Sequence, residues 1–274
     1  MKIDLHSHSF YSDGVLSPSE VVKLASQAGC ELFSLTDHDT TEGSAEAKLE
    51  ADKLNLSLIN GVEISAFWRN MAIHILGLGI DINNDILQTG LEHNQKLRKE
   101  RAEKIALSLW RSGIKDALEK TQSFSKTDML TRTHFAQMLI SEGYCKDMKA
   151  VFRRYLTGKK PGGVSVEWKG FDEVVHWIHA AGGKAIIAHP LRYRMTNTKI
   201  KKLLIDFKGV LGDGIEVVTG TSTEDEVKLS NQWAKDYNLL ASCGSDFHGW
   251  PNQRVRIGNL RNLPDPEKAI WRYL

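Results

Sequence analysis

The sequence predicts an α/β fold in which about seven strands form a parallel barrel, interrupted by one helical insertion. Short apolar runs alternate with amphipathic stretches, which is the pattern of β/α units around a parallel sheet. The chain has 274 residues, a length that suits a single α/β barrel with an insertion. Its hydrophobic fraction of 41% and charged fraction of 26% are those of an ordinary globular protein with a full core.

Four strands are expected before the insertion. KIDLH (2–6) is the first, and the helix after it has Ser17 at the N-cap, Pro18 at its first position and Gly29 at its end. ELFSLTDHD (31–39) is the second strand, and a helix over 42–54 follows it. SLINGVEIS (57–65) and MAIHILGLGI (71–80) are the third and fourth strands.

No strand pattern appears from residue 84 to residue 163. One long helix is expected over 85–113, ending at Gly113, and further helical segments are expected over 133–144 and 148–158. The predicted domains are therefore a barrel made of 1–83 and 164–274, and a helical insertion, 84–163, that caps the mouth of the barrel.

The alternation resumes after the insertion. A helix over 171–183 precedes the strand KAIIAHP (184–190), and a helix over 198–207 precedes the strand GIEVV (214–218). A last helix over 224–237 leads to the strand LLASCGSDFH (239–248).

Charge and cysteine content restrict the functional class. The net charge is +2, from 36 basic and 34 acidic residues, so any anionic partner must be held by a local site and not by a global field. The three cysteines have no metal-type spacing and are expected to be reduced thiols. Asp4 and His6 interrupt any apolar run at the start, and no stretch approaches the ~18 apolar residues of a membrane span, so the expected location is the cytoplasm.

Side chains that bind metals fall at or near the C-terminal ends of the predicted strands. In a parallel barrel these ends face one shared mouth, where such folds place their chemistry. We therefore expect six histidines and three carboxylates to converge there as metal ligands: His6, His8, Asp13, His38, Glu63, His74, His189, Asp246 and His248.

This donor set indicates the kind of metal and of substrate. Mixed imidazole and carboxylate donors suit manganese, iron or zinc, whereas magnesium prefers oxygen donors. Nine ligands exceed what one ion can use, so two or three divalent ions are expected. Their positive charge would exceed that of the three carboxylates, which favours a phosphate substrate over a neutral amide.

The motifs DLHSHS, SDG, TDHD, GVEIS, IHILG, AHP and GSDFH, in this order, resemble those of the polymerase and histidinol phosphatase (PHP) superfamily. The resemblance covers the whole chain and implies a distorted seven-stranded barrel with a trinuclear metal centre. It assigns His6, His8 and Asp246 to one ion, with Glu63 bridging, and assigns His74 and His189 to a second ion that shares Glu63. The third ion would be bound by Asp13, His38 and His248.

Within the superfamily, KERAEK (99–104) and TRTHFA (131–136) make the chain similar to a bacterial group with a helical insertion. That group implies a phosphatase for nucleoside 3′,5′-bisphosphates that also trims 5′-phosphorylated RNA from 5′ to 3′. Thr133 and Leu191 stand where the group pattern has glycine. Direct attack on phosphorus by a metal-bound hydroxide is expected, because no serine or cysteine in the motifs has an adjacent base.

Alternative functions remain at this point. A histidinol phosphatase would use the same site, although the helical insertion argues against it. An amidohydrolase barrel also begins with HxH but has no use for Asp13 and Glu63 as ligands. A non-enzymatic PHP module that stabilises a partner would usually lack ligands, whereas all nine positions are filled here.

Residues outside the donor set are candidates for substrate contacts. Arg132 and His134 open a helix after Thr131, where a helix N-terminus and a guanidinium suit phosphate. The full set of candidates is Arg101, Arg132, His134, Lys160 and Arg194.

Other polar and aromatic residues near the motifs have expected structural roles. Arg98 and Lys99 are expected on a solvated basic face, and Asp37 and Asp39 are expected to orient His38. Glu216, at the end of a predicted strand, is expected to be structural, with support of a metal ligand as the alternative. The histidines outside the motifs are expected to be structural as well, and two tryptophans are candidates to line the mouth: Trp68 and Trp168.

Overall fold

The computed structural model describes residues 1–193, 195–249 and 254–274, and within them the chain has an α/β fold with strands in two sheets. The strands are β1 (Ile3–Asp4), β2 (Leu32–Phe33), β3 (Ser57–Leu58), β4 (Gly61–Trp68), β5 (Met71–Leu78), β6 (Lys184–Ile187), β7 (Gly214–Thr219) and β8 (Leu240–Gly244). The α-helices are α1 (Pro18–Gln27), α2 (Ser44–Lys53), α3 (Asp85–Arg111), α4 (Ala117–Gln122), α5 (Arg132–Ser141), α6 (Met148–Val151), α7 (Phe171–Ala180), α8 (Asn197–Gly209) and α9 (Glu224–Asp236). A π-helical turn, η1 (Phe152–Leu156), and three 3₁₀ turns, η2 (Pro190–Arg192), η3 (Pro266–Lys268) and η4 (Ile270–Arg272), complete the elements.

The two sheets lie edge to edge. β1, β2 and β3 form a parallel sheet, and β4 to β8 form a five-stranded sheet in chain order. The Leu5 amide donates to the Cys243 carbonyl at 3.1 Å, which joins β1 to β8. An isolated parallel bridge between His38 and Glu63 joins the segment after β2 to β4. The strands therefore nearly surround a central space, although their hydrogen bonds form two separate sheets.

One part of the sheet differs from the predicted β/α repeat. The expected third strand divides into β3 and β4, and β4 pairs with β5 as an antiparallel hairpin. Arg69 and Asn70 form its turn with φ of 46° and 63°, as a type I′ turn requires at both central positions. A two-residue connection has no room for the crossover that parallel strands need, so β5 runs antiparallel to both neighbours.

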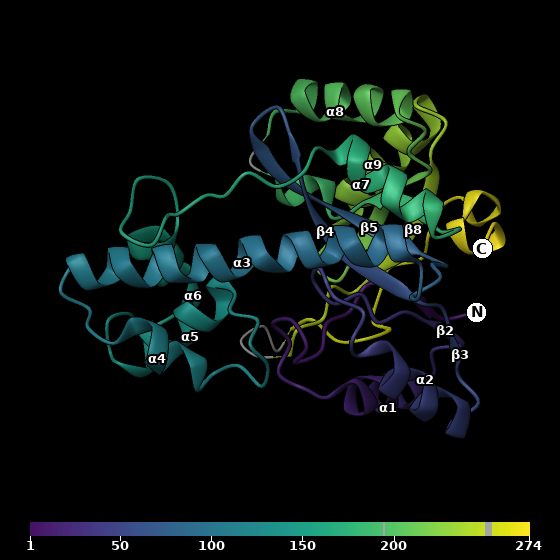
Figure 1. Ribbon diagram of the computed structural model, residues 1–274. Helices are drawn as coiled ribbons and strands as arrows, with labels where there is room; N and C mark the ends of the chain where they lie inside the picture. The colour runs from purple at the N-terminus through teal and green to yellow at the C-terminus, as the bar shows by residue number, and fades with distance from the viewer. Residues whose placement is uncertain (194, 250–253) are drawn as a thin grey trace.

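Helices outside the predicted insertion cover the two sheets (Figure 1). In this view α7, α8 and α9 lie on the five-stranded sheet, while α1 and α2 lie together beside the three-stranded sheet. Ser17 caps α1 through a capping box with Glu20, as the sequence predicts for this helix start. None of the helices in the described ranges is long and apolar enough to cross a membrane.

The long helix α3 connects two hydrophobic cores. Leu87 and Leu91, in its first half, are fully buried in the main core. Ile105 and Leu109, in its second half, belong to a separate cluster with residues of α5. Figure 1 shows this second half and α4 to α6 as a helical lobe beside the sheets. The structure thus gives the segment predicted as an insertion a core of its own, including α4, which the sequence analysis did not expect.

We expect Gly90→Ala to lower the free energy of unfolding by about 1–3 kcal/mol, because an added methyl group would overpack the contact between α3 and α7. A Cβ at this position would meet the Trp177 indole closer than real Cβ contacts allow. Urea denaturation checks the change. Gly209→Ala in α8, with open space around the added carbon, is the matched control and should leave stability unchanged or raise it slightly. Equal stability of the Gly90 variant and the unaltered protein would contradict this packing.

Candidate metal centre

The nine predicted donor residues lie together in the space that the two sheets surround. His6 and His8 follow β1, His189 follows β6, and Asp246 and His248 follow β8. His74 is one exception to the predicted rule, because β5 is antiparallel and brings its N-terminal half to the mouth. His74 pairs there with Ser65 of β4, and its carbonyl accepts the Ala188 amide at 3.1 Å, directly before His189.

Glu63 lies at the centre of the cluster. It is completely buried and lies in the first half of β4. The expectation that it ends a strand is therefore wrong. Its Oε1 is 3.0 Å from His74 Nδ1 and 2.9 Å from His189 Nε2. Its Oε2 is 2.9 Å from His38 Nδ1 and 3.3 Å from Nε2 of both His6 and His8. A single carboxylate therefore contacts side chains from both sheets.

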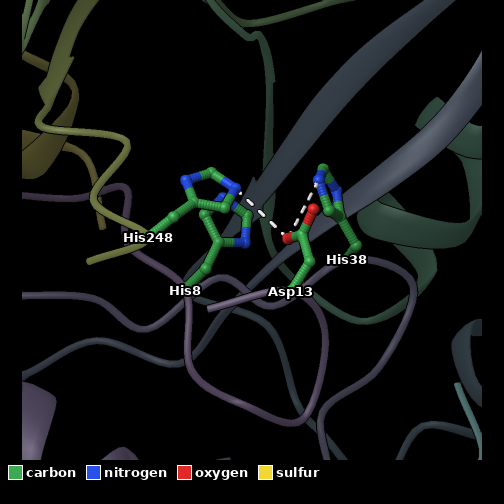
Figure 2. A group of neighbouring side chains, drawn as sticks. All are labelled: His8, Asp13, His38 and His248. Carbon is green, nitrogen blue, oxygen red and sulfur yellow. Dashed lines mark ion pairs between the residues drawn. The ribbon is translucent and has the colours of Figure 1, made fainter. Parts of the chain in front are cut away.

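The other two carboxylates lie on either side of His8. Asp246 Oδ1 is 3.0 Å from His8 Nε2 and 3.2 Å from His6 Nε2. Figure 2 shows Asp13 between two imidazoles, with its Oδ1 at 3.2 Å from His248 Nε2 and 3.7 Å from His38 Nε2. The rings of His8 and His248 stack with centroids 4.1 Å apart.

The protonation states of the three carboxylates and of His38 suit metal binding, whereas, against the effect of burial, nearby carboxylates raise the pKa of three other histidines, His6, His8 and His248. Burial by itself would raise the pKa of Glu63, Asp13 and Asp246, but the surrounding histidines hold each pKa well below its ordinary value. Burial lowers the pKa of His38 to about 4, which leaves its imidazole neutral. Ionised carboxylates and a neutral imidazole are the forms that coordinate metal ions.

The geometry also fits metal ions. Among the donor residues, four buried atoms have no hydrogen-bond partner in the described part of the chain: Asp13 Oδ1, His38 Nδ1, Glu63 Oε2 and His189 Nδ1. Buried polar atoms are normally satisfied, so these four point to a further ligand. Three groups have donor atoms within 4.8 Å of one another: His8, Asp13, His38 and His248; His6, His8, Glu63 and Asp246; and His38, Glu63 and His74. These donors fit divalent cations.

Backbone strain marks two of the donor positions. His189 and Asp246 have φ of 29° and 53°, values that non-glycine residues rarely adopt. Each follows a short strand, and each turns sharply toward the cluster. Such strain is typical of functional sites, where the surrounding structure holds it.

Neighbouring carboxylates brace the donor loops. Asp37 accepts hydrogen bonds from the Ser9 amide at 2.7 Å and from the hydroxyls of Ser9 and Ser12 at 2.6 and 2.7 Å. Asp37 thus holds the loop that carries Asp13. The expectation that it orients His38 is wrong, because its hydrogen bonds go to Ser9 and Ser12. Glu216 accepts from His6 Nδ1 at 3.0 Å and from the His189 amide at 2.6 Å, so it orients two donor residues.

Three arginines, Arg98, Arg101 and Arg132, lie near one another and beside the cluster. The expectation of a solvated face is wrong for Arg98, which is 4% exposed and pairs with Asp39 Oδ2 at 2.6 Å. Asp39 therefore holds α3 against the sheet and does not orient His38. Lys99 is exposed, as expected. The burial of Arg98 could not be predicted, because the sequence of a charge-rich helix does not indicate which of its turns faces a buried carboxylate.

Arg101 is the unusual member of this group. It is 7% exposed, it lies 5.1 Å above the Trp168 ring, and no carboxylate of the described chain forms an ion pair with it. Burial, with Arg98 and Arg132 nearby, lowers the pKa of Arg101 well below its usual range. Burial together with Arg98 also lowers the pKa of Arg132, which is half-buried. Uncompensated buried cations are costly and indicate a place for an anion.

The remaining predicted contacts have separate positions. His134 is buried, and its Nδ1 accepts the Thr131 amide at 3.2 Å, so it caps α5. Lys160 is exposed, and Arg194 lies outside the described residues. Trp168 lies against Arg98 and Arg101, whereas Trp68 donates to Asp206 of α8 at 2.8 Å.

Two residues at the site were missed by the sequence analysis. Arg192, in η2, contacts Asp246 Oδ2 through its guanidinium. Thr133, at the second position of α5, donates its hydroxyl to Asp13 Oδ2 at 2.9 Å. Arg192 follows His189 by three residues, a signal that could have indicated it, whereas the contact of Thr133 depends on how the insertion packs.

A centre of buried imidazoles and carboxylates in an α/β fold is typical of metal-dependent hydrolases. Residues 4–181 match the PHP domain model, and the chain belongs to the PHP domain family. The resemblance drawn from the motifs is thereby confirmed.

Three similar proteins carry functional or structural descriptions. A 3′,5′-nucleoside bisphosphate phosphatase of Chromobacterium violaceum is 43% identical over 99% of this chain and 96% of its own length. A 5′-3′ exoribonuclease of Haemophilus influenzae is 40% identical, covering 98% of each chain. A solved structure described as an amidohydrolase from Chromobacterium violaceum with bound sulfate and no metal is 42% identical with a TM-score of 0.94. The match covers 100% of this chain and 95% of that one.

Proposed function

We propose that this protein is a metal-dependent phosphoesterase that removes the 3′-phosphate of nucleoside 3′,5′-bisphosphates. By the same chemistry it would trim 5′-phosphorylated RNA from 5′ to 3′, because the first RNA linkage is also a 3′-phosphoester. The observation that carries the proposal is that Arg101, which is buried and forms no ion pair among the described residues, lies near Asp13 of a cluster of candidate metal donors. The names of the relatives from Chromobacterium violaceum and Haemophilus influenzae support the same substrates.

The nine donors would hold two or three divalent ions, with manganese our first choice and iron or zinc the others. His6, His8 and Asp246 would bind one ion and His74 and His189 a second, with Glu63 shared between them. Asp13, His38 and His248 would bind the third. Bound ions of this kind hold phosphoryl oxygens and lower the pKa of water.

The chain's own residues would position the substrate. Arg101 and Arg132 would bind the 5′-phosphate, since the two guanidinium groups lie near one another and neither forms an ion pair with a carboxylate of the described residues. Arg192 lies against Asp246 and would supply a further cation next to the scissile phosphate. Arg194 stays a candidate for the same role, and His134 would support Arg132 by capping the helix that carries it.

The insertion, 84–163, would act as a cap over the mouth of a distorted seven-stranded barrel made of 1–83 and 164–274. The separate core of the insertion and the contact of Thr133 with Asp13 support this division. An amidohydrolase function is less well supported, because Asp13 and Glu63 both lie among the donors and such barrels do not use them.

A comparison of three substrates tests the function. With added manganese, we expect hydrolysis of adenosine 3′,5′-bisphosphate and of a 5′-phosphorylated oligoribonucleotide. Histidinol phosphate lacks the 5′-phosphate, so its kcat/KM should be lower by about ten- to a hundredfold, the effect of losing a charge-assisted contact. A preference for histidinol phosphate would favour a histidinol phosphatase. Bound metal without hydrolysis of any of the three would favour a non-enzymatic module.

A further inference from the structure

One side chain of the insertion reaches the donor cluster directly. Thr133 Oγ1 donates to Asp13 Oδ2 at 2.9 Å, across 120 positions of sequence. Asp13 belongs to the loop after β1, whereas Thr133 belongs to α5 of the helical lobe. This hydrogen bond therefore joins the two parts of the chain at a residue that the proposed function uses as a metal ligand.

The two oxygens of Asp13 have different surroundings. Oδ2 accepts the Thr133 hydroxyl, whereas the buried Oδ1 has no hydrogen-bond donor among the described residues and faces His38 and His248. The terminal torsion of an aspartate is broad, so packing alone fixes it weakly. A donor on one oxygen selects which oxygen points into the cluster.

Thr133 is itself held in place. Its amide donates to Thr131 Oγ1 at 3.2 Å, and His134 completes the capping box of this helix start. Phe135 and Leu139, further along α5, are fully buried in the second core. As a β-branched residue, threonine also has few side-chain rotamers in a helix. The hydroxyl is thus oriented by the packing of the insertion.

We propose that Thr133 is a positioning residue, whose hydroxyl holds Asp13 so that Oδ1 is presented as a ligand to a divalent ion. The proposal rests on the metal centre of the proposed function. Hydrogen bonds of this kind to a ligating side chain change metal affinity by about 10- to 100-fold. A glycine, as the family resemblance favours at this position, could not make the contact.

Manganese titration of the metal-free protein, with free Mn²⁺ followed by electron paramagnetic resonance, tests this role without any substrate. Thr133→Val keeps the branched shape but removes the hydroxyl, and it should weaken one ion by about 10- to 100-fold while leaving the others unchanged. Thr133→Ser keeps the hydroxyl and should bind all ions nearly as the unaltered protein does. Thr89→Val, on the exposed side of α3, is the control for a helical threonine replacement and should change nothing.

Three outcomes would overturn the proposal. Thr133→Val could bind every ion as the unaltered protein does, the serine variant could lose as much affinity as the valine variant, or all ions could weaken together with a loss of folded protein. Failure of the proposed function has a different signature, because the unaltered protein would then bind manganese without hydrolysing nucleotides. The titration and the substrate assay therefore separate the two.

Discussion

Glu63→Gln is expected to lower kcat/KM for a nucleoside 3′,5′-bisphosphate by roughly 200- to 5000-fold, because removing one partner of a buried charged group costs about 3–5 kcal/mol. Glu63 is fully buried, and its two oxygens lie within 3.3 Å of nitrogens from five histidines. The glutamine side chain keeps the shape of glutamate but has no charge, and an NH2 group replaces one of the two carboxylate oxygens. This NH2 group donates hydrogen bonds and cannot bind the cations that the surrounding imidazoles are expected to hold.

Metal analysis of the same variant shows whether the loss comes from the ions. Mass spectrometry of the purified protein should find at least one ion fewer per chain than in the unaltered protein. Glu50→Gln changes a carboxylate that pairs with Lys23 and Lys53 and lies outside the cluster, so it should leave metal content and kcat/KM unchanged. Full metal content and full activity in the Glu63 variant would exclude a bridging role for this residue.

Arg132→Ala is expected to lower kcat/KM about ten- to a hundredfold on substrates with a 5′-phosphate, and much less on substrates with a 5′-hydroxyl. The reason is that burial and nearby guanidinium groups lower the pKa of both arginines, Arg132 being one of the charges that act on Arg101, and a bound phosphate would offset this repulsion. Paired steady-state assays on a 5′-phosphorylated and a 5′-hydroxyl oligoribonucleotide measure the difference.

Lys99→Ala is the matched control for this experiment. Lys99 is an exposed cation on α3, two positions before Arg101, and its loss should affect both substrates equally and weakly. Equal losses on both substrates for Arg132→Ala would mean that this residue supports the fold of the insertion, and that the 5′ end is bound elsewhere.

Local features of the chain were sufficient to predict most helices and the members of the donor cluster. Ser17, Pro18 and the apolar spacing after them define α1, since caps and periodicity depend on residues within a few positions. His6, His189 and Asp246 each follow a short apolar run that forms a strand, so each lies at the edge of the sheet where its strand ends. The convergence of these three residues could be predicted because the C-terminal ends of parallel strands meet, with the order and direction of the strands assumed.

Strand direction was the first feature that depended on tertiary structure. MAIHILGLGI reads as a strand in either direction, and the turn at Arg69 and Asn70 makes it the second strand of a hairpin. His74 still reaches the cluster, but from the first half of β5 and not from its end. The sequence pattern of a strand records which face is buried and carries no information about which neighbour it pairs with.

The sequence by itself determined the α/β class, the helix starts and which imidazole and carboxylate side chains gather in the cluster, because each depends on short-range spacing. Only the tertiary structure decided that Arg98 is buried against Asp39, that Arg192 contacts Asp246, and that Thr133 bonds Asp13. These pairs lie 59, 54 and 120 positions apart, so they form only once distant segments of the chain have packed together. A charged or hydroxyl side chain on a helix can face solvent or a buried partner, and that choice is made by the packing of distant segments.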